Sequence, residues 1–243
     1  MLNTLIQWDC LEVMKSIPDG SIDAIITDPP YWTTACKWDS VIPFEPMWEQ
    51  LKRIIKPNGA IVLFWSEPFS SALRMSNIKQ YKYDWIWKKS KSSNPFLAKY
   101  QPMRNYENIL VFCNWKTVYN PIMEFVWIKD KRKSLNPFVQ KEWSIFWNGS
   151  AVRKKDDWFR FPNQVLEFWN SDRTKSLHPT QKPVELLEYL IKTYTNEWDT
   201  VLDNCAWSGT TGIAARNTNR NYILIEKDEW YCDIIRNRLS PSL

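Results

Sequence analysis

The feature that most constrains this chain is a short apolar run that two prolines bring to a stop. Residues 22–26 form a run of the kind that becomes a strand buried on both faces of a sheet. Pro29 and Pro30 then end the strand, because proline lacks a backbone donor and fixes φ. Asp28 and Tyr31 are therefore left at the carboxyl end of a strand, where open α/β sheets bind ligands.

The residues at this stop have the chemistry to bind a flat molecule that carries an amino group. The carboxylate of Asp28 and the carbonyl of Pro29 accept hydrogen bonds from an NH2 group, and the ring of Tyr31 stacks on a planar ring. An ordinary proline turn with an exposed acid would explain an isolated tetrapeptide equally well. A second motif far downstream favours the binding site.

The composition limits the classes of protein that the chain can form. Its 243 residues allow one large domain, or a domain with a substantial insertion. The net charge is +5, and residues 86–175 are rich in both basic and aromatic side chains, which is compatible with a nucleic-acid face.

The cysteines and the histidine argue against metal and disulfide frameworks. Five scattered cysteines without a Cys-x-x-Cys pair favour a reducing compartment. His178 is the only histidine, so we expect no metal site. The sequence contains neither a signal peptide nor an apolar run of transmembrane length, and we expect a cytoplasmic protein.

Tryptophan is unusually frequent and glycine unusually rare. The chain has 16 Trp and 5 Gly, whereas glycine averages about 7% of residues. Several tryptophans stand where turns need glycine, as Trp198 does between a helix and a strand. We predict that ten are glycine in the natural protein, because a UGA codon read as glycine by the source was translated as tryptophan. They are Trp8, Trp32, Trp65, Trp115, Trp127, Trp143, Trp147, Trp169, Trp198 and Trp207. The alternative is a genuinely Trp-rich protein, which TGG codons in the natural gene would establish.

The first half of the chain is predicted to alternate between strands and helices. A strand that ends at Asp9 and a short helix come first, the proline-stopped strand follows, and 32–42 form a polar loop able to close over the site. Further elements are expected at 46–55 (helix, ended by 57–59), 60–64 (strand), 68–78 (helix), 83–88 and 109–113 (strands). This order predicts an α/β fold, a doubly wound and mostly parallel sheet with an antiparallel edge.

Residues 115–176 lose this regularity. Basic clusters at 129–133 and 153–155 are interleaved with aromatic side chains such as Phe146 and Phe159. Basic residues neutralise phosphates, and aromatic rings stack on bases or wedge between them. We interpret the segment as an insertion that recognises a nucleic-acid target; a solvated insertion with its own small core is the plainer alternative.

Regular order returns after residue 176 and predicts a nucleotide-type half-fold. A helix is expected from Pro183 to about residue 194, followed by a strand at 200–203, a small-residue turn at 204–212 and a helix from 213. A strand at 221–226 then ends at Glu226, which is able to bind a ribose diol, and a helix covers 229–239. The absence of G-x-G-x-x-G and G-K-[ST] motifs lowers the case for NAD or ATP.

Together these motifs resemble the β-class of S-adenosylmethionine-dependent DNA amino-methyltransferases, the enzymes that methylate adenine N6 or cytosine N4. Asp28-Pro29-Pro30-Tyr31 matches their catalytic motif, and residues 178–183 resemble the segment that leads into their cofactor-side helix. Residues 202–211 resemble their cofactor loop, and 8–11 the element that contacts the cofactor's adenine. The likeness covers about 1–113 and 176–239.

The resemblance implies a circularly permuted, Rossmann-like methyltransferase fold in three parts. Residues 1–114 would be the catalytic half, 115–176 the target-recognition insertion and 177–243 the cofactor-binding half. The implied reaction is methyl transfer from S-adenosylmethionine to adenine N6 at a specific site in double-stranded DNA. Aspartate at the first motif position favours adenine, since the cytosine-N4 enzymes of the family more often carry serine there. A homodimer and a partner restriction endonuclease would be compatible with the family.

The resemblance also assigns site residues. The implied catalytic residues are Asp28, Pro29, Pro30 and Tyr31. The implied cofactor-binding residues are Asp9, Cys10, Asp28, His178, Thr180, Lys182, Pro183, Asp203, Asn204, Cys205, Ala206, Trp207, Ser208, Gly209, Thr210, Thr211, Glu226 and Lys227. For Asp9, a helix cap is the alternative.

Two other functions stay open at this point. The first is methylation of cytosine N4. The second is a catalytically dead DNA-binding homologue, which follows if Trp207 is genuine. The family has glycine at the positions of Trp8, Trp32 and Trp207, and an indole at 207 would stand where glycine lets the backbone approach the cofactor's methionine moiety.

Overall fold

The computed structural model of the protein describes residues 2–30, 42–93, 95–125, 159–169, 177 and 181–240. The chain divides into one unit of Met1–Asn120 with Asn163–Leu243, and a second unit of Pro121–Pro162. In the described part of the second unit, β6 (Glu124–Phe125) pairs antiparallel with β7 (Phe159–Arg160). The second unit lies within the insertion predicted at 115–176, and the three-part division itself stays a prediction.

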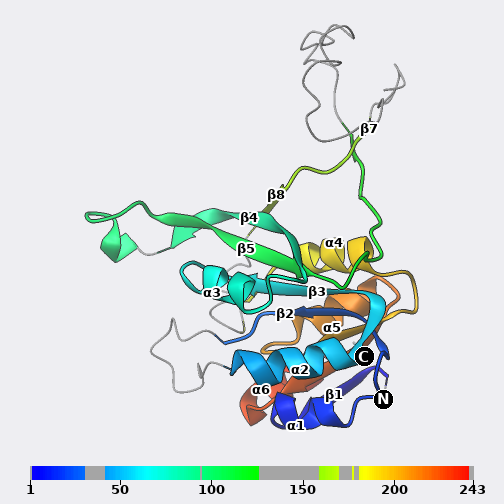
Figure 1. Ribbon diagram of the computed structural model, residues 1–243. Helices are drawn as coiled ribbons and strands as arrows, with labels where there is room; N and C mark the ends of the chain where they lie inside the picture. The colour runs from blue at the N-terminus through cyan, green and yellow to red at the C-terminus, as the bar shows by residue number, and fades with distance from the viewer. Residues whose placement is uncertain are drawn as a thin grey trace, which may run out of the picture. The chain divides into compact units, whose positions relative to one another are not determined.

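An eight-stranded sheet forms the centre of the first unit, in the order β1-β10-β9-β2-β3-β5-β4-β8 (Figure 1). The strands are β1 (Thr4–Gln7), β2 (Ile22–Thr27), β3 (Ile55–Trp65), β4 (Tyr81–Ser93), β5 (Arg104–Phe112), β8 (Val165–Phe168), β9 (Thr200–Asp203) and β10 (Asn221–Glu226). Neighbours in this sheet are parallel except for the two pairs that involve β5. The predicted α/β fold with a mostly parallel sheet is confirmed.

The antiparallel strand is not at the edge of the sheet, where the sequence led us to expect it. β5 lies between β3 and β4, and β8 pairs parallel with β4 to become the edge strand. Leu166 of β8 is buried, and the indole Nε1 of Trp87 donates to the carbonyl of Phe168 at 3.1 Å. β8 has four residues and lies inside an irregular segment, so its alternation of apolar and polar residues is too short to predict a strand.

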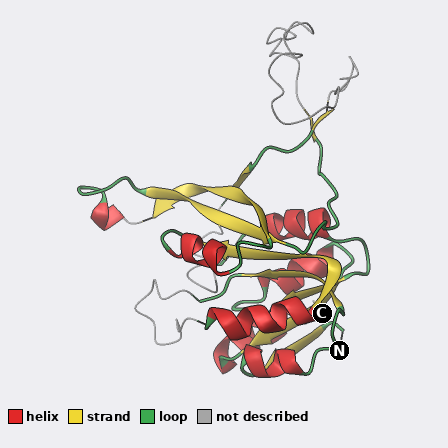
Figure 2. Ribbon diagram, viewed as in Figure 1, coloured by secondary structure: helices red, strands yellow, loops and turns green. Residues whose placement is uncertain are grey.

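Helices cover both faces of this sheet (Figure 2). They are α1 (Cys10–Lys15), α2 (Phe44–Ile54), α3 (Phe69–Ser76), α4 (Val184–Tyr194), α5 (Thr210–Asn217) and α6 (Glu229–Leu239), with a short 3-10 turn, η1, at Pro95–Leu97. Apolar residues of α1, α2 and α3 share one buried cluster with the sheet, and those of α4 and α5 share another. Among the helices in the described ranges, none is both long enough and apolar enough to cross a membrane.

Residues 57–59 differ from the prediction, which placed them in a turn after a helix. They lie inside β3, where the register with β2 moves from Ile22↔Ile55 to Ala24↔Ala60. Residues 56–59 therefore bulge opposite Asp23, whose carboxylate binds the ammonium of Lys56 at 2.6 Å. Pro57 and Gly59 fit such a bulge, because neither residue suits a regular ladder.

Three tryptophans that the recoding hypothesis leaves unchanged are core residues. Trp48, Trp85 and Trp87 are buried, and each indole donates a hydrogen bond: to Ser76 Oγ at 2.8 Å, to Tyr194 OH at 2.6 Å and to Phe168 O at 3.1 Å, respectively. Burial with a satisfied N–H is the usual environment of tryptophan in a folded protein.

Most of the described tryptophans that we predict to be glycine have a different environment. Trp8, Trp115, Trp169 and Trp198 are between 65% and 90% exposed. Trp198 and Trp207 have φ values of 70° and 48°, in the left-handed region that glycine adopts without steric cost.

Trp65 is an exception, because it is buried and its ring centre lies 6.0 Å from that of Phe44. Trp32, Trp127, Trp143 and Trp147 lie outside the described residues. The recoding hypothesis thus gains support at the exposed and left-handed positions and stays a prediction until the gene is read.

Candidate active site

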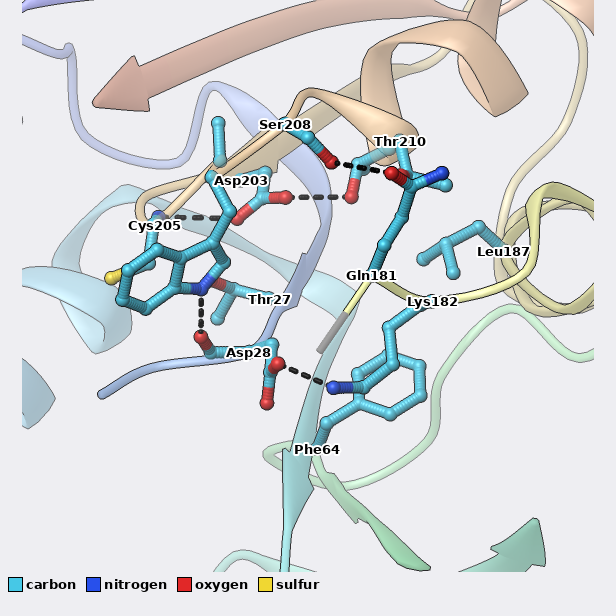
Figure 3. A pocket seen from close by; sticks show the side chains of 13 residues that line it. Thr27, Asp28, Phe64, Gln181, Lys182, Leu187, Asp203, Cys205, Ser208 and Thr210 are labelled. Atoms are coloured by element: carbon cyan, nitrogen blue, oxygen red, sulfur yellow. Dashed lines mark hydrogen bonds and ion pairs between the residues drawn. The ribbon is translucent and has the colours of Figure 1, made fainter. Parts of the chain in front are cut away.

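The candidate site lies at the carboxyl ends of β2 and β9, which are parallel neighbours in the sheet. Asp28 follows β2, Asp203 ends β9, and the small-residue loop 204–209 leads into α5. A cavity lies between them (Figure 3), lined by Thr27, Asp28, Phe64, Gln181, Lys182, Leu187, Asp203, Cys205, Ala206, Trp207, Ser208, Thr210 and Thr211. The fold therefore brings together the proline stop and the small-residue loop, although Asp28 and Trp207 are 179 positions apart in the chain.

Asp28 is a buried carboxylate with one oxygen paired and the other open. Its side chain is 12% exposed, and Oδ2 accepts a hydrogen bond from the ammonium of Lys182 in a close ion pair. Oδ1 is buried and has no hydrogen-bond partner within the described part of the chain. Burial raises the pKa of Asp28 to about 6, with Lys182 opposing the rise and Glu107 adding to it.

Lys182 connects Asp28 to a second buried pair. Its ammonium lies 3.5 Å from Glu107 Oε2 and 5.3 Å from the centre of the Phe64 ring. Glu107 also forms an ion pair with Lys89 of β4. Although burial works in the opposite direction, the charges of Lys182 and Lys89 lower the pKa of Glu107.

Phe64, Lys89 and Glu107 were not predicted as site residues from the sequence. β5 runs antiparallel to β3, so the start of β5 lies at the same edge as the end of β2. Side chains alternate along a strand, which puts Glu107 on the same face as Ile109 and Val111, under α4. The signal for Glu107 in the sequence was an acid two residues before an apolar run. Whether that acid lies at the site depends on which strand pairs with β5, and the sequence does not show this.

The cofactor-side loop is held by Asp203. The carboxylate of Asp203 accepts from Thr211 Oγ1 at 2.6 Å and from the backbone N–H of Cys205 at 3.1 Å. Burial raises the pKa of Asp203, and these hydrogen bonds oppose the rise. Gly209 caps α5 with a φ of 75°, a left-handed conformation that glycine adopts without steric cost.

The side chain of Trp207 fills the space inside this loop. Its Nε1 donates to the backbone carbonyl of Asp28 at 2.7 Å, and its ring meets that of Tyr231 edge-on at 6.1 Å. The remaining cavity is about 30 Å³, whereas ligand pockets measure roughly 300–1,000 Å³. The left-handed φ of 48° shows a backbone shaped for glycine. With the indole in place, this loop leaves too little room for the nucleotide-type cofactor that the resemblance implies.

Glu226 ends β10, as predicted, and its carboxylate faces backbone amides. Oε2 accepts from Trp207 N at 2.8 Å, and Oε1 accepts from Lys227 N and Asp228 N at 2.9 Å. Burial raises the pKa of Glu226 to about 7. A carboxylate offers about four acceptor positions, so one stays available for the predicted ribose contact.

Asp9 and Cys10 lie where β1 meets α1. Asp9 caps α1 by accepting from Leu11 N at 3.0 Å, and its Oδ2 lies 3.6 Å from the ammonium of Lys227. A hydrogen bond between the thiols of Cys10 and Cys205 lowers the pKa of Cys10 and raises that of Cys205. The cap is therefore established for Asp9, and contact with an adenine ring stays a prediction.

Several predicted site residues are placed only by their position in the chain. Tyr31, His178 and Thr180 lie outside the described residues, as does nearly all of the predicted closing loop. Pro183 is the N-cap residue of α4. The catalytic and cofactor-binding assignments stay predictions.

Comparison with known proteins finds relatives along nearly the whole chain. The profile of a family described as DNA methylase matches residues 22–237. The Type II methyltransferase M.HinfI of Haemophilus influenzae is 30% identical over 261 residues, which cover 98% of this chain and 68% of that protein. The Type II methyltransferase M2.DpnII of Streptococcus pneumoniae is 27% identical and covers 98% of this chain and 90% of its own length.

Solved structures agree with these relatives. The M1.HpyAVI–SAM complex superposes with a TM-score of 0.64 and 26% identity, covering 97% of this chain and 99% of that one. The PvuII DNA methyltransferase, named as cytosine-N4-specific, superposes with a TM-score of 0.69 over 98% of this chain and 86% of its own, but its 17% identity bears on the fold alone. The chain therefore belongs to the DNA methylase family, the S-adenosylmethionine-dependent amino-methyltransferases of DNA.

Proposed function

We propose that the protein methylates N6 of adenine at a specific site in double-stranded DNA. The observation that carries this proposal is Asp28 Oδ1, a buried acceptor with no partner among the described residues, beside the cofactor loop. An exocyclic amino group that donates to Oδ1 satisfies this oxygen, and the hydrogen bond draws the nitrogen lone pair out of conjugation with the ring.

Positioning is the main catalytic contribution in this proposal. The target base leaves the DNA stack at a cost of a few kcal/mol. Asp28 and the carbonyl of Pro29 then orient the amino group, while Tyr31 stacks on the base. With glycine at 207, residues 203–211 would hold S-adenosylmethionine, with Glu226 at its ribose, and the cofactor would supply the methyl group. The amino nitrogen would take the methyl group as the bond between the methyl carbon and the sulfonium sulfur breaks, and it would give up one proton, which the adjacent carboxylate of Asp28 accepts.

A hairpin at the same edge of the sheet supports a DNA substrate. β4 runs in the same direction as β2 and β3, because both β3 and β4 are antiparallel to β5. The β4–β5 hairpin therefore extends beyond the edge that carries Asp28 (Figure 1). Its tip carries Phe96 and Tyr100, 93% and 85% exposed, together with the exposed Lys91 and Lys99. Exposed rings beside cations suit contact with bases and phosphates.

Analysis of the modified base tests the choice of adenine. The Trp207→Gly protein is incubated with unmethylated genomic DNA and S-adenosylmethionine, and the digested nucleosides are identified by mass spectrometry. We expect N6-methyladenine. N4-methylcytosine would instead establish the cytosine reaction.

The position of the Trp207 indole favours one other function for the chain as written. A protein with a filled cofactor cavity would bind DNA without methylating it. Cofactor titration against the Trp207→Gly protein separates the two functions. Target recognition by 115–176, a homodimer, a partner endonuclease and a cytoplasmic location are proposed with the enzyme and rest on the family resemblance.

A further inference from the structure

Four buried charges form a row that ends at Asp28. Lys89 comes from β4, Glu107 from β5, Lys182 from the segment before α4, and Asp28 from the end of β2. Their side chains are 15%, 8%, 7% and 12% exposed, respectively. Burying such charges costs free energy that their attraction often fails to recover, so a row of this kind is poor evidence for a role in stability. Its position at the candidate site indicates a role in the chemistry instead.

Lys182 fixes how the Asp28 carboxylate is presented. The ammonium binds Oδ2 and leaves Oδ1 as the oxygen without a partner in the described structure. The ring of Phe64 lies against the ammonium at 5.3 Å, and Glu107 Oε2 lies on another side at 3.5 Å. Figure 3 shows the side chain of Lys182 reaching across Phe64 to Asp28. A cation with contacts on three sides has little freedom to move. The carboxylate that it binds is therefore held in one orientation.

We propose that Lys182 is a positioning residue that keeps Asp28 ionised and turns Oδ1 toward the amino group of the target base, with Glu107 holding Lys182 in place. This inference rests on the proposed function, because it assumes that Asp28 receives an amino group. It gives Lys182 a different task from the cofactor contact that the family resemblance implied.

The charges around Asp28 explain why it needs such a neighbour. Among the described residues, the charged groups that act on Asp28 are Lys182, Glu107 and Asp203. Burial and the two carboxylates raise the pKa of Asp28, and Lys182 is the one group of the described structure that opposes them. Without Lys182 the carboxyl would hold its proton at neutral pH, and a protonated oxygen is a poorer acceptor for an amino N–H.

Glu107 acts on Asp28 in two ways of opposite sign. Its negative charge raises the pKa of Asp28 directly, while its contact with Lys182 holds the cation that lowers it. A Glu107→Gln variant removes the charge but keeps a side-chain oxygen that accepts from Lys182, so the direct effect is lost while Lys182 stays in place. The two substitutions Lys182→Met and Glu107→Gln should therefore move the titration of Asp28 in opposite directions, which a loss of packing alone would not do.

The decisive measurement is the titration of Asp28 in the cofactor-free protein. Carbon-13 NMR of the labelled carboxyl, assigned with Asp28→Asn, follows ionisation without any need for activity. We expect Lys182→Met to raise the titration midpoint by about 1 to 3 pH units, the usual effect of an adjacent opposite charge. Glu107→Gln should lower it, and Lys182→Arg, which keeps the charge, should leave it close to that of the parent protein.

The matched control is Lys192→Met, an exposed lysine on α4, which should leave the midpoint unchanged. An unchanged or lowered midpoint in a folded Lys182→Met protein, judged by circular dichroism, would overturn the positioning role. The second readout is the pH profile of single-turnover methylation, measured with each variant made in the Trp207→Gly protein, and its acid limb should move with the NMR midpoint. If NMR shows the shifts but no variant methylates DNA, the proposed function fails and the electrostatic role of Lys182 stands.

Discussion

The indole Nε1 of Trp207 donates a hydrogen bond to the backbone carbonyl of Asp28 at 2.7 Å. One ring thus joins the two strand ends that form the site and occupies the space between them. The backbone at 207 is left-handed, with a φ of 48°, which is unfavourable for tryptophan and natural for glycine. The chain is consistent with an enzyme whose cofactor pocket one substituted side chain has filled.

Trp207→Gly should therefore open the pocket to S-adenosylmethionine. The parent protein is expected to show no measurable binding by isothermal titration calorimetry, and the variant a Kd in the micromolar range, about −8 kcal/mol. Trp115→Gly, which removes an exposed indole elsewhere, should not restore binding. Equal affinity in the parent and Trp207→Gly proteins would show that the indole moves aside and that 207 is not the obstruction.

Trp198→Gly should stabilise the protein. Trp198 has a φ of 70° and lies exposed between α4 and β9, and a left-handed conformation costs a non-glycine residue about 1–2 kcal/mol. We expect the free energy of unfolding in urea to rise by about 1 kcal/mol. Trp169→Gly, also exposed but without a positive φ, should give no such gain. A lower stability for Trp198→Gly would argue for a genuine tryptophan there.

Asp28→Asn should abolish methylation and spare cofactor binding, when made in the Trp207→Gly protein. The amide keeps the shape of the carboxylate but loses its charge. Its NH2 group can also face the amino group of the base, where an acceptor is needed. We expect a fall in single-turnover rate of about a hundredfold or more. Asp233→Asn, an exposed change on α6, serves as the control. A rate close to that of the Trp207→Gly parent would remove Asp28 from the mechanism.

Glu226 should make the protein less stable as pH rises toward neutrality. Its pKa is about 7 in the folded protein and 4.5 as a free side chain. Between these values the unfolded chain releases a proton that the folded protein retains, so stability present at low pH is lost as pH rises through the folded pKa. Between about pH 5 and 8, the free energy of unfolding should therefore decrease by about 2–3 kcal/mol less in Glu226→Gln than in the parent protein.

Urea denaturation across this pH range measures the difference. Glu229→Gln, at an exposed position on α6, should reproduce the slope of the parent protein. An identical slope in the Glu226→Gln protein would mean that other groups produce the pH dependence.

The β4–β5 hairpin should contribute to DNA affinity through Phe96 and Tyr100. Each ring that stacks on a base contributes about 1–3 kcal/mol, so the double alanine variant should bind duplex DNA at least tenfold more weakly by fluorescence anisotropy. Replacing Lys91 and Lys99 with glutamine should instead reduce the dependence of affinity on salt. Met75→Ala, an exposed apolar change on α3, should do neither. Unchanged affinity in the Phe96/Tyr100 variant would exclude the hairpin from the interface.

The order of the elements and the chemistry at their ends could be predicted from local patterns along the chain. Apolar periodicity, the pair Pro29-Pro30 and the acids Asp28, Asp203 and Glu226 act within a few neighbouring residues, so they can be read along the chain. The strand that Pro29 stops, the loop after Asp203 and the terminal helix were predicted on this basis and are present.

Which side chains meet depends on the packing of distant strands and could not be predicted from the sequence. Lys182 binds Asp28 from 154 positions away, and Glu107 lies behind it because β5 enters the sheet antiparallel beside β3. The edge position of β8 depends likewise on pairing with a distant strand. Such contacts depend on strand order, register and the covered face of the sheet, and burial and the charge of Lys182 then act in opposite directions on the pKa of Asp28. These are properties of the packed molecule, and no local pattern in the sequence carries them.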